Sequence, residues 1–176
     1  RVRGRKDLDG LSVPFIGEIP LAFRGKKKTK SHEAHTIVVK EGSRDIMNEA
    51  FRVLRTNLEF MIGKDKSSNV IIVTSLNPGS GKSFLTMNIA MSLAIKNKKV
   101  LVIDGDLRHA SASAYIHSPE VGLSNYLGGQ VDKLSDIIIT DEKHASFSFI
   151  PVGTIPPNPT ELLFDDRLRE AIDTLK

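Results

Sequence analysis

The chain contains no cysteine and no tryptophan, and aromatic residues make up only 6% of its 176 positions. The lack of cysteine excludes a disulfide framework and a thiolate metal site. Its five histidines lack zinc-type spacing, and no Gly-x-Ser-x-Gly elbow or histidine triad pattern indicates hydrolase chemistry. No apolar run reaches the roughly 18 residues of a membrane-spanning helix, and no signal-peptide pattern occurs. With 40% hydrophobic residues, the chain can bury the core of one domain.

The most informative segment is 75–83, which reads Ser-Leu-Asn-Pro-Gly-Ser-Gly-Lys-Ser. An apolar run at 70–74 predicts a buried strand before it, and a second apolar run at 84–95 predicts a buried helix after it. A strand, a glycine-rich turn and a helix opening on Gly-Lys-Ser form a cradle whose backbone N–H groups bind phosphate. Lys82 is expected to reach the outer phosphates, and the Ser83 hydroxyl to ligate Mg²⁺. We therefore predict that the chain binds a nucleoside triphosphate.

This loop departs from the usual spacing at one position. Leu76 stands where the pattern asks for its first glycine, and Pro78-Gly79 supplies the tight turn instead. The alternative is a glycine-rich junction between a strand and a helix that holds no ligand. The apolar runs on both sides of the loop favour the phosphate site.

A second candidate strand, 100–103, ends in the sequence Asp104-Gly105-Asp106-Leu107-Arg108. It follows the first predicted strand by about 30 residues, the length of one βαβ unit. We therefore expect an α/β fold with a parallel β-sheet flanked by helices, in which both strands end at one edge. Alternate residues of an extended segment point the same way, so Asp104 and Asp106 would both face one Mg²⁺ shell. Taken alone, the same residues also fit a solvated turn.

A helix is predicted over about 44–62, with Ser43 as its N-cap and Gly63 just past its end. Its apolar positions step by four and three residues, and they predict a stripe that packs on the core: Met47, Phe51, Leu54, Leu58 and Met61.

The polar side of this helix carries Glu49 and Arg52, with Arg55 on its flank. Spacing alone fits either a solvated face joined by a local Glu–Arg pair or a contact between subunits.

The remaining elements are less regular. They comprise a short strand at 15–19, a short helix within 122–129, an undecided helix or strand at 134–140, a parallel strand at 146–152, a stiff proline loop at 156–159 and a last helix from about 161 or 165.

Positive charge is concentrated at the start of the chain. Residues 1–30 hold nine Lys or Arg against three Asp or Glu, whereas the whole chain has a net charge of +4. This segment fits a solvated flexible stretch or a juxtamembrane stretch on the cytoplasmic side of a membrane. We expect no nucleic-acid partner, because no aromatic residues interleave with the basic ones. We therefore divide the chain into a basic approach segment, 1–42, and a nucleotide-binding domain, 43–176.

Together these residues resemble the bacterial tyrosine kinases. The resemblance is carried by the phosphate loop, by the motif at 104–108, by the helix at 49–58, and by the segments 13–20 and 151–163. It implies a P-loop fold of the MinD/ParA type and an ATP-dependent kinase that autophosphorylates tyrosines in the C-terminal tail of a neighbouring subunit within a ring. It also implies a transmembrane polysaccharide co-polymerase partner, in the same chain or a separate one. The place of action would be the cytoplasmic face of the bacterial inner membrane.

The resemblance also assigns roles to residues of this sequence. Gly79 to Ser83 match the Walker A loop, Asp104 and Asp106 match the Walker A-prime carboxylates, and Glu49, Arg52 and Arg55 match the ExxRxxR oligomerisation motif. The expected catalytic residues are Lys82, Asp104 and Asp106, and the expected Mg²⁺ ligands are Ser83 and Asp104. ATP would be held by Pro78, Gly79, Ser80, Gly81, Lys82, Ser83 and Phe84.

Three departures from the kinase pattern bear on function. We expect the Walker B strand to follow 173–176, and the tyrosine-rich tail to lie later still. The only tyrosines here, Tyr115 and Tyr126, are expected to have packing or surface roles. Asn77 replaces the signature lysine of MinD/ParA ATPases, which favours the kinase. The alternatives are a MinD/ParA-like switch ATPase and a nucleotide-binding, non-catalytic scaffold of a co-polymerase.

Overall fold

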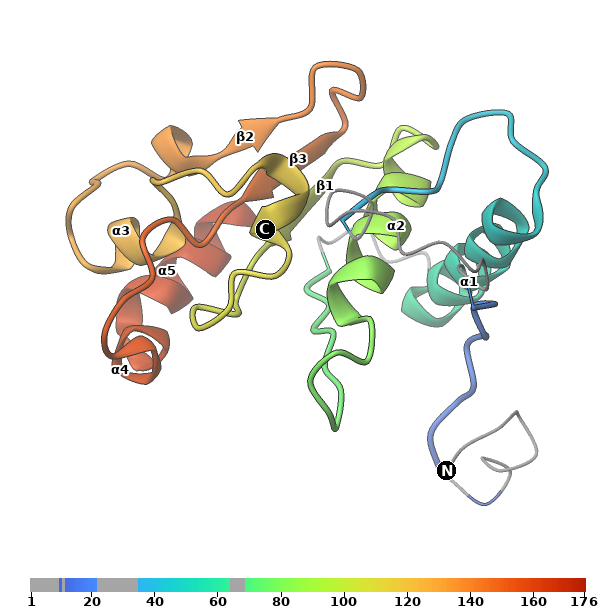
Figure 1. Ribbon diagram of the computed structural model, residues 1–176, viewed down its shortest axis with the longest axis horizontal. Coiled ribbons are helices and arrows are strands. Elements are labelled where there is room, and N and C mark those ends of the chain that lie inside the picture. The colour runs from blue at the N-terminus through green and yellow to red at the C-terminus, as the bar shows by residue number, and fades with distance from the viewer. Residues whose placement is uncertain (1–9, 11, 22–34, 64–68) are drawn as a thin grey trace, which may run out of the picture.

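A small mixed sheet lies between two groups of helices (Figure 1). The computed structural model describes residues 10, 12–21, 35–63 and 69–176. The sheet has the strand order β1-β3-β2, and β3 pairs parallel with β1 and antiparallel with β2. The strands are β1 (Val100–Ile103), β2 (Ile139–Thr140) and β3 (Phe147–Ile150). The helices are α1 (Ile46–Ile62), α2 (Lys82–Ala94), α3 (Leu123–Leu127), α4 (Pro159–Phe164) and α5 (Asp166–Leu175), with 3-10 turns at Ser113–Ile116 and Leu134–Ile137.

Side chains of β1 and β3 contribute to two hydrophobic cores. Phe147 and Phe149 of β3 pack with Phe51 of α1 and Met87 of α2 on one face. Ile150 contributes to the other core, which includes residues of α3 and α5. This alternation follows from the two-residue period of a strand. The α/β class and the parallel pairing of the two predicted strands at 100–103 and 146–152 are therefore confirmed.

Helix α1 begins two residues later than expected, because Asp45 rather than Ser43 is its N-cap. The Asp45 Oδ1 atom accepts the backbone N–H groups of Met47 at 2.9 Å and Asn48 at 3.0 Å. The Ser43 hydroxyl donates to the same carboxylate, and together with the Asn48 N–H it lowers the pKa of Asp45 to about 2. At the other end, Gly63 ends the helix with φ of 77°, as predicted.

The apolar stripe of α1 packs on the core through Met47, Phe51 and Leu54 but not at its C-terminal end. Phe51 and Leu54 are 0% and 3% exposed, whereas Met61 near the end of the helix is 50% exposed.

The extended segment that leads into α1 is held by two asparagine side chains. The buried Asn88 of α2 accepts the N–H groups of Val38 at 2.7 Å and Val39 at 3.1 Å. Asn48 of α1 accepts the N–H of Lys40 at 2.7 Å and donates to the carbonyl of Val38 at 3.3 Å. These amides satisfy backbone groups that a neighbouring strand would otherwise pair.

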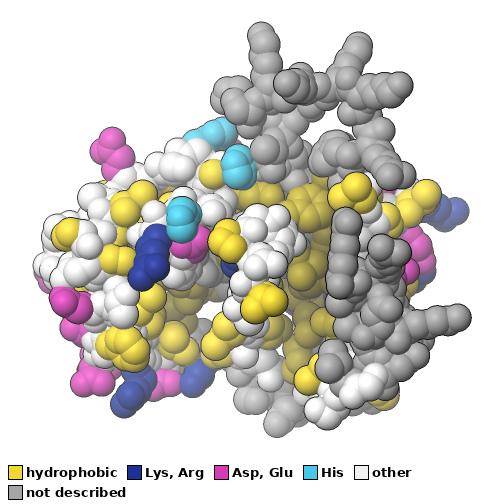
Figure 2. Space-filling model, turned by 60° about the horizontal axis from the view of Figure 1, so that its bottom comes forward, with side chains coloured by type: hydrophobic (Ala, Val, Ile, Leu, Met, Phe, Trp, Pro, Cys, Tyr) yellow, Lys and Arg dark blue, Asp and Glu magenta, His cyan; other side chains and the backbone are white. Residues whose placement is uncertain are grey.

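The predicted buried strand at 70–74 is wrong. Val70, Ile71 and Ile72 are 55%, 48% and 86% exposed, and this segment belongs to no strand of the described sheet. Its β-branched residues favour extended backbone, but a strand forms only where a second strand supplies hydrogen bonds. Figure 2 shows that hydrophobic side chains are exposed on one face of the described part of the molecule.

The strand predicted at 15–19 is also absent from the described structure. The carbonyl of Ile16 instead accepts a hydrogen bond from the Asn57 side chain of α1 at 2.8 Å.

The undecided segment at 134–140 contains a 3-10 turn followed by β2. The last predicted helix divides into α4 and α5 at Asp165, whose carboxylate caps α5 by accepting the N–H of Arg167 at 2.8 Å. Across the ranges described above, no helix is both long and apolar enough to cross a membrane. Most of the basic segment 1–42 lies outside the described residues.

Candidate functional site

The glycine-rich loop presents an open helix end. The hydroxyls of Ser75 and Ser80 both donate to the carbonyl of Asn77, at 2.8 and 2.7 Å, and this folds the loop back on itself. Gly81, at φ of 90°, is the N-cap of α2, and no side chain caps the helix. Only glycine adopts this left-handed backbone without strain. The first N–H groups of α2 thus lack side-chain partners, which is the condition for binding an anion there.

The two side chains expected to act on phosphate are half-buried and available. Neither the Lys82 amine nor the Ser83 hydroxyl has a hydrogen bond or ion pair with any residue in the described part of the chain. Phe84 behaves differently, because its ring packs edge-on against Phe51 at 5.8 Å. Its side chain therefore belongs to the core, and only its backbone is left to contact a nucleotide.

The two expected carboxylates have different surroundings. Asp104 is 4% exposed, and both of its carboxylate oxygens accept hydrogen bonds. Its Oδ1 accepts the N–H of Asp106 at 3.2 Å, and its Oδ2 accepts both the N–H and the hydroxyl of Ser113 at 2.7 Å. The Asp106 side chain is 37% exposed and lies 3.3 Å from His109 Nδ1. Asp104 is thus fixed within the fold, whereas Asp106 faces solvent.

Helix α2 connects the two motifs. Its first turn carries Lys82 and Ser83, and its body packs on β1, whose carboxyl end carries Asp104. No hydrogen bond or ion pair between described residues joins the loop to either carboxylate. Nor do three or more His, Asp or Glu side chains gather into a metal-binding cluster in the ranges searched.

The predicted oligomerisation residues lie in two different environments. Arg52 and Glu49 form an exposed ion pair, and their hydrogen bond raises the pKa of Arg52 and lowers that of Glu49. Arg55 is only 9% exposed, and its Nη1 donates to the Ser92 carbonyl at 2.9 Å and to the Ser92 hydroxyl at 3.2 Å. Its Nε has no hydrogen-bond partner among the described atoms and lies 3.9 Å from the Glu59 carboxylate. Arg55 therefore ties α1 to α2.

We expect Arg55→Ala to lower the free energy of unfolding by about 2 to 3 kcal/mol, because it removes charged hydrogen bonds and buried packing between two helices. Arg52→Ala is the matched control. It removes one exposed ion pair that solvent screens, so its expected effect on the free energy of unfolding is small beside that of Arg55→Ala. Urea unfolding followed by circular dichroism measures both variants. Equal effects of the two substitutions would contradict the buried role of Arg55.

Backbone hydrogen bonds join the loop after β3 to α3, and no pattern in the sequence predicted them. The N–H groups of Leu123 and Ser124 donate to the carbonyls of Pro151 and Val152, at 2.8 and 2.9 Å. The Ser124 hydroxyl donates to the Thr154 carbonyl. A Cβ atom on Gly153 would lie only 2.4 Å from the backbone nitrogen of Gly122, so these segments touch because both residues are glycine.

Both tyrosines are packed, in agreement with the expectation. Tyr126 is 9% exposed and lies under the guanidinium of Arg167, which is 4.6 Å from the ring centre. Tyr115 contacts the ring of His35 edge-on at 5.4 Å, and burial raises its pKa.

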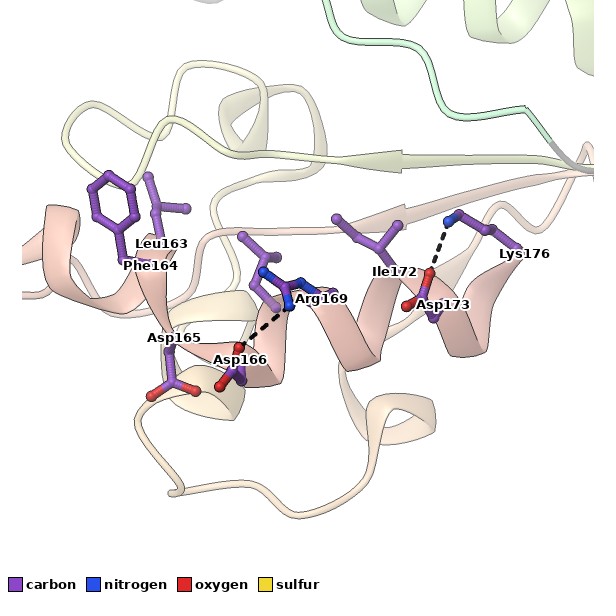
Figure 3. Close-up of a pocket in the computed structure, with 9 residues that line it drawn as sticks. Leu163, Phe164, Asp165, Asp166, Arg169, Ile172, Asp173 and Lys176 are labelled. Atoms are coloured by element: carbon purple, nitrogen blue, oxygen red, sulfur yellow. Dashed lines mark hydrogen bonds and ion pairs between the residues drawn. The ribbon is translucent and has the colours of Figure 1, made fainter.

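A hollow of about 310 Å³ lies along α4 and α5, apart from the residues predicted for the site (Figure 3). Apolar side chains line it, among them Leu163, Phe164 and Ile172. Its two cations are already paired, Arg169 with Asp166 at 3.8 Å and Lys176 with Asp173 at 2.8 Å. The hollow therefore offers no free charged group that would recognise a phosphate.

The uncapped glycine loop and the carboxylates at the end of a parallel strand define a P-loop nucleotide-binding domain. The profile of the CbiA family, the CobQ/CobB/MinD/ParA nucleotide binding domain, matches residues 71–171. The chain therefore belongs to this family.

Within this family, the chain is similar to proteins named as bacterial tyrosine kinases. The chain is 36% identical to the "Putative tyrosine-protein kinase AmsA" of Erwinia amylovora, over 95% of this chain and 24% of that protein. It is 32% identical to a "Putative tyrosine-protein kinase in cps region" of Klebsiella pneumoniae, over 92% of this chain and 22% of that protein. The solved kinase domain of the Escherichia coli tyrosine kinase ETK superposes with a TM-score of 0.72 at 33% identity, over 90% of this chain and 62% of that one. The expected resemblance to bacterial tyrosine kinases is confirmed. The chain spans about a quarter of the length of these curated relatives.

Proposed function

We propose that this chain is the nucleotide-binding part of an ATP-dependent protein-tyrosine kinase that autophosphorylates and serves capsular or exopolysaccharide synthesis. The observation that carries the proposal is the uncapped end of α2, where the Lys82 amine and the Ser83 hydroxyl have no partner among the described residues. The names of the relatives, one of them from a cps region, supply the reaction class and the biological setting.

The loop from Pro78 to Phe84 would hold the phosphates of ATP, with backbone N–H groups and Lys82 as the donors. Ser83 and Asp104 would hold Mg²⁺, which supplies positive charge against the phosphate oxygens. Asp104 fits this role through Oδ1, which accepts one hydrogen bond and keeps a second lone pair, whereas Oδ2 already accepts two. Lys82 offsets the charge that develops on the transferred phosphoryl group.

Asp106 would accept the proton of the incoming tyrosine hydroxyl. Asp106 is more exposed than Asp104, which supports this role because the tyrosine that accepts the phosphoryl group must approach from solvent. Both tyrosines of this sequence are packed, so the acceptor would come from the tail of a neighbouring subunit.

The exposed Glu49–Arg52 face of α1 would form the contact between subunits of a ring. Arg55 would support this contact indirectly, by fixing α1 on α2. The basic residues of 1–30 fit a place beside the cytoplasmic face of the inner membrane, next to a transmembrane co-polymerase region.

The test is incubation of the full-length protein with γ-labelled ATP and Mg²⁺, followed by phosphoamino-acid analysis. Label on tyrosine, lost when EDTA removes the metal, is the expected result. Released phosphate without labelled protein would contradict the kinase and favour a switch ATPase. ATP bound without turnover would favour the scaffold.

A further inference from the structure

Ser113 occupies a junction between the two strand ends nearest the proposed site. It is 1% exposed and begins the 3-10 turn that closes the loop following Asp104. Its N–H and its hydroxyl both donate to Asp104 Oδ2 at 2.7 Å. Two of the three hydrogen bonds that Asp104 accepts therefore come from this one serine.

The Ser113 hydroxyl also accepts a hydrogen bond, from the N–H of Val152 at 2.9 Å. Val152 is fully buried and follows β3 by two residues, while Asp104 follows β1 directly. A hydroxyl that donates on one side and accepts on the other has its rotation fixed. Ser113 thus ties the carboxyl ends of the two parallel strands together.

We propose that Ser113 is a positioning residue for phosphoryl transfer, which aims the Asp104 carboxylate and anchors the far end of the loop that carries Asp106. This inference rests on the proposed kinase function. With Oδ2 held by Ser113, the free lone pair of Oδ1 has a fixed direction. Neither motif comparison nor residue spacing points to Ser113, because its partners are 9 and 39 residues away.

Ser113→Ala removes the hydroxyl donor and leaves a freer carboxylate. We expect kcat for tyrosine phosphorylation to fall roughly 10- to 100-fold, the range for one hydrogen bond to a charged group that orients the reaction. The KM for ATP should stay within about 2-fold, because the described hydrogen bonds of the Ser113 hydroxyl go to Asp104 and Val152 and not to the loop at 78–84, so the change acts on the reaction more than on binding. Ser113→Cys keeps the side-chain connectivity but replaces the hydroxyl with a larger thiol that donates weakly, so it should lose activity in the same way.

The matched control is Ser124→Ala. It removes a buried serine hydroxyl that bonds the same loop after β3, through the Thr154 carbonyl, without touching Asp104. We expect its kcat to stay within about 3-fold of the wild type, since it orients no reacting group. Circular dichroism and thermal unfolding of every variant keep loss of folding apart from loss of positioning.

The full-length proteins are compared by steady-state phosphorylation with γ-labelled ATP. A fall in kcat at constant KM in both Ser113 variants, with Ser124→Ala near the wild type, supports the proposal. Equal losses in Ser113→Ala and Ser124→Ala, or wild-type kcat in Ser113→Ala, overturn it and leave the kinase intact. A wild-type protein that binds ATP without labelling tyrosine overturns the proposed function itself, and the inference with it.

Discussion

Lys82→Met is expected to reduce tyrosine phosphorylation by at least roughly 100- to 1,000-fold, the loss typical when a charge-stabilising donor is removed from a transition state. Methionine keeps most of the length and the apolar character of the lysine stem but carries no charge. The Lys82 amine has no partner among the described residues, so its loss breaks no described interaction of the fold. Phosphotyrosine formation by the purified full-length protein measures the effect.

Lys98→Met is the control for this prediction, because Lys98 is an exposed lysine just past the other end of the same helix. We expect wild-type phosphorylation from it and an unchanged unfolding transition from both variants. Substantial phosphorylation by the Lys82 variant would show that Lys82 of the glycine loop is not needed for phosphoryl transfer in this protein, and it would contradict the prediction.

Gly153→Ala is expected to lower the free energy of unfolding by at least about 3 kcal/mol, the largest stability effect that we predict. The backbone at Gly153 has φ of 79°, which an L side chain rarely adopts. An added Cβ would also lie 2.1 Å from Asn125 Oδ1 and 2.4 Å from the nitrogen of Gly122. Both contacts are far inside van der Waals distance, so the loop after β3 would have to leave α3.

Gly42→Ala separates the cost of the left-handed backbone from the cost of the close contacts of the added Cβ. Gly42 has a similar φ of 72°, but a Cβ there would meet no atom of the described residues within 4 Å. We therefore expect this control to lose only about 1 to 2 kcal/mol, the strain of a left-handed alanine. If urea unfolding gave equal losses of unfolding free energy at the two positions, the close approach of Gly153 to α3 would not contribute to stability.

Local patterns predicted the elements that depend on local interactions. The periodic apolar residues of α1, the apolar run of α2 and the short apolar runs of β1 and β3 predicted the type of each of these elements, with bounds correct to within a few residues. The segment 70–74 has the same composition as a strand, yet it has no partner in the described sheet. Pairing is a property of distant residues, and no local pattern reports it.

The site shows the same division between local and distant causes. The spacing of the loop residues and both aspartates predicted their places at the start of α2 and after the end of β1, whereas their roles toward phosphate stay a prediction. Arg55 was expected beside an exposed face, since a helical wheel shows its angle but not the Ser92 carbonyl of the next helix. Ser113 was missed because a lone serine carries no pattern, and only the fold brings it to Asp104.

The chain leading into α1 has an uncommon attachment. Its backbone amides at Val38 and Val39 end on the side chain of Asn88, in the helix that begins with the phosphate loop. A tension applied upstream would therefore reach α2 through the carboxamide of Asn88 and α1 through that of Asn48, and would bypass the sheet. Because side chains and not a second strand make this attachment, substitutions at positions 48 and 88 would remove these hydrogen bonds and leave every strand pairing in place.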